Sequence, residues 1–141
     1  MDAVLEHLPI FIFQRGNCGT AHDLVQHLNT LESSGLVRLA VAQPELEYLF
    51  RHALIHDAAY GSLVKQDRMQ LHRAVGETLE RTYPDRLEEL APLLGHHFDE
   101  AGDDQRALKY FTQAADSAVR VYANAEAVMH YARALDIAKE Q

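Results

Sequence analysis

Apolar residues recur at helical spacing along most of the chain, and the first clear case lies between Thr20 and Ser34. There the apolar positions stand three or four residues apart, Thr20 can cap the start, and Gly35 follows where a left-handed residue ends a helix. Two runs rich in β-forming residues, 36–41 and 46–51, then flank a proline. The pattern predicts a helix followed by a β-hairpin.

Upstream, residues 3–8 are compatible with an earlier short helix, and residues 16–19 are typical of a loop. An early helix, a helix of about 15 residues and a hairpin occur in this order in winged-helix units. We therefore expect residues 1–63 to form a winged-helix-like element and residues 64–141 a second domain.

The chain after the hairpin has the periodicity of successive helices. We expect helices over residues 53–63, 67–83, 104–121 and 124–139, with one more that ends near residue 101. That additional helix either kinks or begins at Pro92, because proline is tolerated only in a first turn. In the helix that opens at Asp67, the predicted apolar face consists of Leu71, Ala74, Val75 and Leu79.

Small and aromatic residues share one spacing in the last two predicted helices. The trio Ala107, Phe111 and Ala114 recurs twenty residues later as Ala127, Tyr131 and Ala134. A Leu-Gly pair and an aromatic residue precede the first trio, which is the tetratricopeptide arrangement. The packing signature is Leu94, Gly95, Phe98, Ala107, Phe111, Ala114, Ala127, Tyr131 and Ala134. The predicted fold is mainly α, with a tetratricopeptide-like antiparallel helical array after the winged-helix-like element.

Charge argues against a nucleic-acid-binding function. The 141 residues contain 13 Lys+Arg and 21 Asp+Glu, a formal charge of −8. The charge is −4 over residues 1–50, +1 over 51–83 and −5 over 84–141. Binding to phosphates requires a basic face, so we expect nucleic acid to be an unlikely partner.

No apolar run approaches the length of a spanning helix, and a single cysteine, Cys18, cannot form an internal disulfide. We therefore expect a soluble, cytoplasmic protein without membrane association.

No combination of residues predicts a catalytic, cofactor or metal site. His52 and His56 stand four apart, but zinc needs one or two further ligands. His96 and His97 are expected to lie on a solvated helix face. Cys18 would need a base beside it to act as a nucleophile. We accordingly predict no enzyme activity for this chain, no cofactor and no metal.

Aromatic residues of the last helices could line a peptide groove, although packing between helices is their commoner role. Tyr110 and Tyr122 fall off the small-residue stripe and are expected to be the more exposed rings. They form the candidate interaction surface.

Three segments, 49–63, 71–75 and 94–103, resemble the region that follows the nucleotide-binding module in large bacterial STAND-type AAA signalling ATPases. Such proteins are often fused to adenylate or guanylate cyclases, kinases or transcription regulators. The motif residues are Phe50, Arg51, His52, Ala53, Leu54, Ile55, Ala59, Tyr60 and Leu63.

The resemblance implies an arm that senses or scaffolds, with ATP binding elsewhere in a parent chain; this chain lacks the GxxxxGK[ST] loop. The implied function is a non-catalytic regulatory module that transmits conformational signals to a protein partner or to other domains of the parent ATPase. The alternative is a DNA-binding winged-helix transcription regulator, although the helix from Thr20 to Ser34 contains no Lys or Arg. The partner's identity and the oligomeric state stay open.

Overall fold

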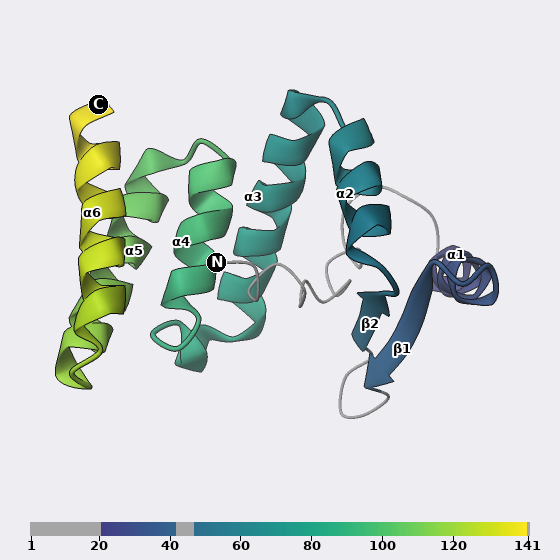
Figure 1. The fold of residues 1–141 in the computed structure, drawn as a ribbon, viewed down its shortest axis with the longest axis horizontal. Helices are drawn as coiled ribbons and strands as arrows, with labels where there is room; N and C mark the ends of the chain where they lie inside the picture. Colours follow the sequence, from purple (N-terminus) through teal and green to yellow (C-terminus); the bar gives the residue numbers. More distant parts are fainter. Residues whose placement is uncertain (1–20, 42–46, 141) are drawn as a thin grey trace. The chain divides into compact units, whose positions relative to one another are not determined.

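The computed structural model describes residues 21–41 and 47–140 (Figure 1). These residues are mainly helical, with one two-stranded antiparallel hairpin. The chain divides into two compact units, with the boundary between Leu63 and Val64. The expected helix at 3–8, the loop at 16–19 and the proline between the two β-rich runs lie outside the described residues, as does Cys18.

The first unit contains helix α1 (Ala21–Ser33), strands β1 (Val37–Val41) and β2 (Glu47–Phe50), and helix α2 (Ala53–Ser62). The strands pair with Val37 opposite Phe50 and Leu39 opposite Tyr48, and the register shifts between Leu39 and Val41. A small core joins α1 to the hairpin through Leu28, Val37 and Tyr48, with Phe50 packed against it. The predicted helix and hairpin are confirmed.

Gly35 ends α1 in the way the sequence predicts. Its φ is +74°, its N–H donates to the Glu32 carbonyl, and the Leu36 N–H donates to the Leu31 carbonyl, both at 3.0 Å. This pair of bonds is a Schellman motif, which satisfies carbonyls left free at a helix end. Glycine fits because it has no Cβ to clash at positive φ.

The second unit contains α3 (Lys65–Thr82), the 3₁₀ turn η1 (Pro84–Arg86), α4 (Ala91–Glu100), α5 (Asp104–Arg120) and α6 (Asn124–Glu140). The four α-helices lie side by side in chain order, α3 against α4, α4 against α5 and α5 against α6 (Figure 1). Pro92 lies in the first turn of α4, so the helix begins there and does not kink.

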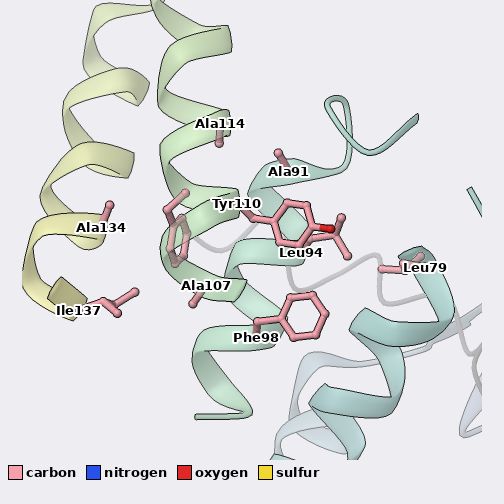
Figure 2. Close-up of a cluster of buried hydrophobic side chains, with 10 residues drawn as sticks. Leu79, Ala91, Leu94, Phe98, Ala107, Tyr110, Ala114, Ala134 and Ile137 are labelled. Carbon is pink, nitrogen blue, oxygen red and sulfur yellow. The ribbon is translucent and has the colours of Figure 1, made fainter. Parts of the chain in front are cut away.

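One hydrophobic cluster joins the helices of the second unit (Figure 2). It consists of Leu79, Ala91, Leu94, Phe98, Ala107, Tyr110, Phe111, Ala114, Ala134 and Ile137. Most of these side chains come from α4 and α5, because these two helices have a neighbour on each side.

Glycines of this unit receive aromatic rings from the following helix. A Cβ at Gly76 of α3 would stand 2.7 Å from Cζ of Phe98 in α4. A Cβ at Gly95 of α4 would stand 2.9 Å from Cδ1 of Phe111 in α5. Real Cβ atoms do not approach so closely, so these two glycines allow neighbouring helices to interlock.

The predicted apolar face of α3 is only partly correct. Leu79 is buried and Val75 half-buried, but Leu71 and Ala74 are exposed. The buried positions are His72, Gly76 and Leu79. The prediction was based on the spacing of large apolar residues. It did not identify this face because two of the three buried residues, His72 and Gly76, are not large apolar residues.

Tyr122 joins α5 to α6 in a conformation that usually requires glycine. Its φ is +60°, its N–H donates to the Val119 carbonyl, and the Ala123 N–H donates to the Ala118 carbonyl. The side chain is 88% exposed. A non-glycine residue in this region is strained, and little packing offsets the strain here.

Replacing Tyr122 by Gly is therefore expected to raise the free energy of unfolding by about 1 kcal/mol. Urea unfolding followed by circular dichroism measures the change. Gly102→Ala is the matched control, because Gly102 has φ +68° at the equivalent position after α4; it should lose about 1 kcal/mol. A less stable Tyr122→Gly protein would contradict the assigned strain.

Candidate functional site

Eight of the nine packing-signature residues are buried in the second unit. Their exposed fractions run from 0% to 7%, and Gly95 is also buried. Tyr131 is the exception: it is 41% exposed, and its hydroxyl donates to the Asp116 carboxylate of α5. Its assignment to the packed interior is therefore wrong, because the ring lies at the edge of the α5–α6 contact with its polar end bound outside the core.

Tyr110 is buried, which corrects the prediction that it is an exposed interaction residue. It is 1% exposed, its ring stacks on Phe98 at 5.7 Å between centroids, and its hydroxyl donates to the Glu80 carboxylate. Burial, followed by the bond to Glu80, raises the pKa of Tyr110. A tyrosine outside the row of small residues can still be buried when its hydroxyl makes a hydrogen bond.

Arg106 links α5 to α3 beside this tyrosine. Its guanidinium carbon lies 4.0 Å from the centroid of the Phe98 ring. Its Nη1 and Nη2 donate to Glu80 at 3.3 Å and to Glu77 at 3.1 Å. Its Nε donates to Asp103 at 2.8 Å, and the Arg106 backbone N–H donates to the same carboxylate at 3.1 Å. Asp103 therefore caps α5 and orients the arginine.

Neighbouring charges stabilise the ionised form of that cap. Burial acts to raise the pKa of Asp103, but the backbone and side-chain hydrogen bonds from Arg106 outweigh it and hold the pKa below its usual value. The Arg106 guanidinium donates hydrogen bonds to all three carboxylates, Asp103, Glu77 and Glu80. The arrangement fits a structural role in joining α3 to α5 better than a catalytic one.

The outer face of α6 exposes a row of large apolar side chains. Val128, Tyr131 and Leu135 are 68%, 41% and 55% exposed. Their spacing of three and four residues places them on one side of the helix. The buried positions of α6, Ala127, Ala134 and Ile137, belong to a different side, the one that α5 covers. We call Val128, Tyr131 and Leu135 the α6 row.

Tyr122 is exposed as the sequence predicts, and it lies at the turn that begins α6. Val119 and Val121 beside it are 48% and 72% exposed. Of the two tyrosines in the predicted interaction surface, only Tyr122 is therefore accessible. The α6 row was missed because the repeat spacing predicts a packed Tyr131, and Val128 and Leu135 carry no chemical signature.

The family-motif residues lie at the junction of β2 and α2. The Arg51 N–H donates to the Leu36 carbonyl at 3.1 Å, which ties this junction to the start of β1. His52 is the extended residue before α2, Leu54 is 80% exposed, and Ile55 is half-buried. The remaining motif residues are the half-buried Phe50, Tyr60 and Leu63 and the exposed Ala53 and Ala59.

His56 packs between two aromatic rings instead of facing His52. Its ring contacts Phe50 edge to face at 5.3 Å and stacks on Tyr60 at 6.1 Å. Its Nδ1 lies 3.1 Å from Oδ1 of Asp57. His52 has extended backbone angles, so the two histidines do not share a helix face.

His97 is buried, which contradicts the expectation of a solvated His96–His97 face. His97 is 1% exposed and pairs with His72 of α3, which is 5% exposed. Adjacent side chains on a helix point about 100° apart, so one of two neighbouring histidines can enter the α3–α4 contact. His96 is half-buried. The burial of His72 could have been predicted from its spacing, because it stands four residues before Gly76 and seven before Leu79, on the same face of α3.

Across residues 21–41 and 47–140, no group of three or more His, Cys, Asp or Glu side chains is arranged to hold a metal ion. Over the same part of the chain, no helix combines the length and apolar character needed to cross a membrane.

Comparison with known proteins identifies no relative. No protein-family model matches the chain, and neither a curated protein nor a solved structure is significantly similar to it.

Proposed function

We propose that this chain is a non-catalytic protein-interaction module, the arm of a cytoplasmic STAND-type signalling ATPase, and that it binds its partner through the α6 row. In this proposal residues 1–63 are the winged-helix-like element and residues 64–141 are the tetratricopeptide-like array. The arm transmits conformational signals through helix packing, and ATP is bound elsewhere in the parent protein.

Two features of the fold support these assignments. The order α1, hairpin, α2 matches the second half of a winged-helix unit followed by a helix. Helix α3 interlocks with α4 through Gly76 and Phe98, and α4 interlocks with α5 through Gly95 and Phe111. Small residues that face rings on a neighbouring helix are the packing principle of tetratricopeptide arrays.

The α6 row is the observation that carries the proposed function. Exposed single apolar residues are ordinary, but three on one face of a helix form a stripe of the kind that normally packs against another helix. The α4 and α5 helices have neighbours on two sides, whereas the α6 row is uncovered. A partner that covered it would continue the same packing.

The row and its surroundings specify the partner's chemistry. A helical row with spacing i, i+3, i+7 fits the apolar stripe of another amphipathic helix. Asp116 of α5 accepts the Tyr131 hydroxyl, Asp136 follows Leu135 directly in the chain, and residues 84–141 carry a net charge of −5. We therefore expect the partner to be an amphipathic helix with basic residues beside its apolar stripe.

Photo-crosslinking in the source cells tests this function. A photoreactive phenylalanine derivative at position 128 should crosslink to a single protein segment, which mass spectrometry can sequence. The expected segment is an amphipathic helix with basic flanks. The same group at Gln70, an exposed polar position of α3, is the matched control and should not capture that segment.

A second variant makes the result specific to the row. Leu135→Glu should lower the crosslinking yield from position 128 at least about tenfold, because it places a charge within the apolar contact. Its circular dichroism spectrum should match that of the wild type, since Leu135 is 55% exposed. Equal capture from positions 128 and 70, capture of a second copy alone, or ATP hydrolysis by the purified chain would contradict the proposal.

The assignment to a parent ATPase has a separate test. An antibody raised against these 141 residues should detect a native band far heavier than 15.9 kDa in a lysate of the source organism. A native band near 15.9 kDa would contradict the ATPase arm, while the crosslinking result would still decide whether the chain is an interaction module.

A further inference from the structure

Two buried histidines meet at the contact between α3 and α4. Nδ1 of His72 lies 2.9 Å from Nδ1 of His97, and the ring centroids are 5.1 Å apart. A hydrogen bond between two Nδ1 atoms needs one N–H and one lone pair, so one ring donates and the other accepts. The bond survives with one shared proton and is lost when both Nδ1 atoms are protonated.

The second nitrogen of His97 makes protonation harder still. Nε2 of His97 is buried and has no hydrogen-bond partner. When His97 Nδ1–H is the donor, Nε2 keeps a bare lone pair, which costs less than an unpaired N–H. Adding a proton to His97 would bury a cation whose new N–H points at no acceptor.

Charged groups of α3, α4 and α5 lie around the pair. On α3, Arg73 donates across the contact to the Ala101 carbonyl at 3.5 Å. On α4, the His96 ring lies 5.7 Å from each of the other two rings, and Glu100 acts on His72 with the opposite sign. On the α5 side, Arg106 covers the Phe98 ring next to His97 and is bound to Asp103, Glu77 and Glu80. Glu100, which is exposed, acts to raise the pKa of His72, whereas burial and His96 act to lower it.

The pKa values agree with this geometry. Burial, followed by the positive charges of His72 and His96, lowers the pKa of His97 to about 3. Burial, followed by His96, lowers the pKa of His72, and Glu100 opposes the shift. Both rings are therefore neutral in the folded protein at neutral pH.

We propose that the His72–His97 pair is an acid-sensitive latch, which holds α3 against α4 when both rings are neutral and releases the contact when they are protonated. Release would uncover the face on which Gly76 receives Phe98. The latch lies within the second unit and does not depend on the function proposed for the α6 row.

The direction of the pH dependence follows from linkage. Because the folded-state pKa values lie below the unfolded value of about 6.5, the unfolded or opened state binds more protons as the pH falls. The stabilisation is complete above about pH 6.5 and decreases as the pH falls toward the folded-state values. Each histidine can raise the opening equilibrium constant up to about tenfold for each pH unit in this range.

Unfolding of the full chain by urea at pH 7.5 and pH 5.0 tests the latch. The double variant His72→Leu/His97→Leu removes both titrating rings and both Nδ1 atoms of the bond between them. Between the two pH values, the unfolding constant of the wild type should rise at least about tenfold more than that of the double variant. His130→Gln, which removes a half-buried histidine at the α5–α6 contact, should retain most of the wild-type pH dependence.

Nuclear magnetic resonance provides a test that does not depend on the variant folding. In the wild-type chain, the ring signals of His97 should not titrate between pH 7.5 and 5.5, and those of His72 should titrate below the ordinary histidine value of about 6.5. Titration of His97 near pH 6.5, or equal acid destabilisation of the wild type and the double variant, would overturn the latch.

Discussion

Phe111→Ala is expected to lower the free energy of unfolding of the second unit by about 3 to 5 kcal/mol. The Phe111 side chain is 7% exposed, fills the space over Gly95, and stacks on His130 at 6.0 Å between centroids. Its removal leaves a cavity between three helices that cannot close without moving α4 or α6. Urea unfolding monitored by circular dichroism at 222 nm measures the loss.

Val119→Ala is the control for this substitution, because Val119 lies on the same helix and is 48% exposed. It should change the free energy of unfolding by less than about 0.5 kcal/mol. Equal stabilities for Phe111→Ala and the wild type would mean that α4, α5 and α6 do not pack around this ring.

Gly76→Val should destabilise the second unit by about 3 kcal/mol, through overpacking instead of a cavity. A Cβ at this position already falls 2.7 Å from Cζ and 2.8 Å from Cε1 of Phe98. The Phe98 ring cannot easily yield, because Tyr110 stacks on it and Arg106 covers it. The midpoint of thermal unfolding should fall accordingly.

Ala74→Val tests whether the effect comes from the contact or from helix propensity. Ala74 lies two residues earlier in α3 and is exposed, so this variant should lose less than about 1 kcal/mol. Adding Phe98→Leu to Gly76→Val should make the combined loss smaller than the sum of the two single losses. Strict additivity would contradict direct contact between Gly76 and Phe98.

Local signals in the sequence predicted the elements of the fold well. Gly35 and Gly102 end helices with positive φ, and Pro92 marks the beginning of α4. Such residues restrict the backbone at their own position, so their effect does not depend on distant neighbours. The hairpin after Gly35 was also predictable, because its two β-rich runs are neighbours in the chain and a proline separates them.

The candidate sites were less predictable, because they depend on partners far away in sequence. Tyr110 is buried because Glu80, thirty residues earlier, accepts its hydroxyl. His97 is buried because His72 lies opposite it across the α3–α4 contact. Tyr131 fits the repeat spacing, but Asp116 holds its hydroxyl at the edge of the core. Periodicity identifies a helix face and cannot identify what that face meets.

Two charged contacts reach past the adjacent helix. Arg106 of α5 binds Glu77 and Glu80 of α3, and both oxygens of Asp99 in α4 accept bonds of 2.6 Å from Arg133 of α6. A stack held together by adjacent contacts alone could lose its helices one at a time from an end. Because α5 is tied to α3 and α6 to α4, loss of one helix also breaks a contact two places away. These ties make the unfolding of the four helices more cooperative than their serial arrangement implies.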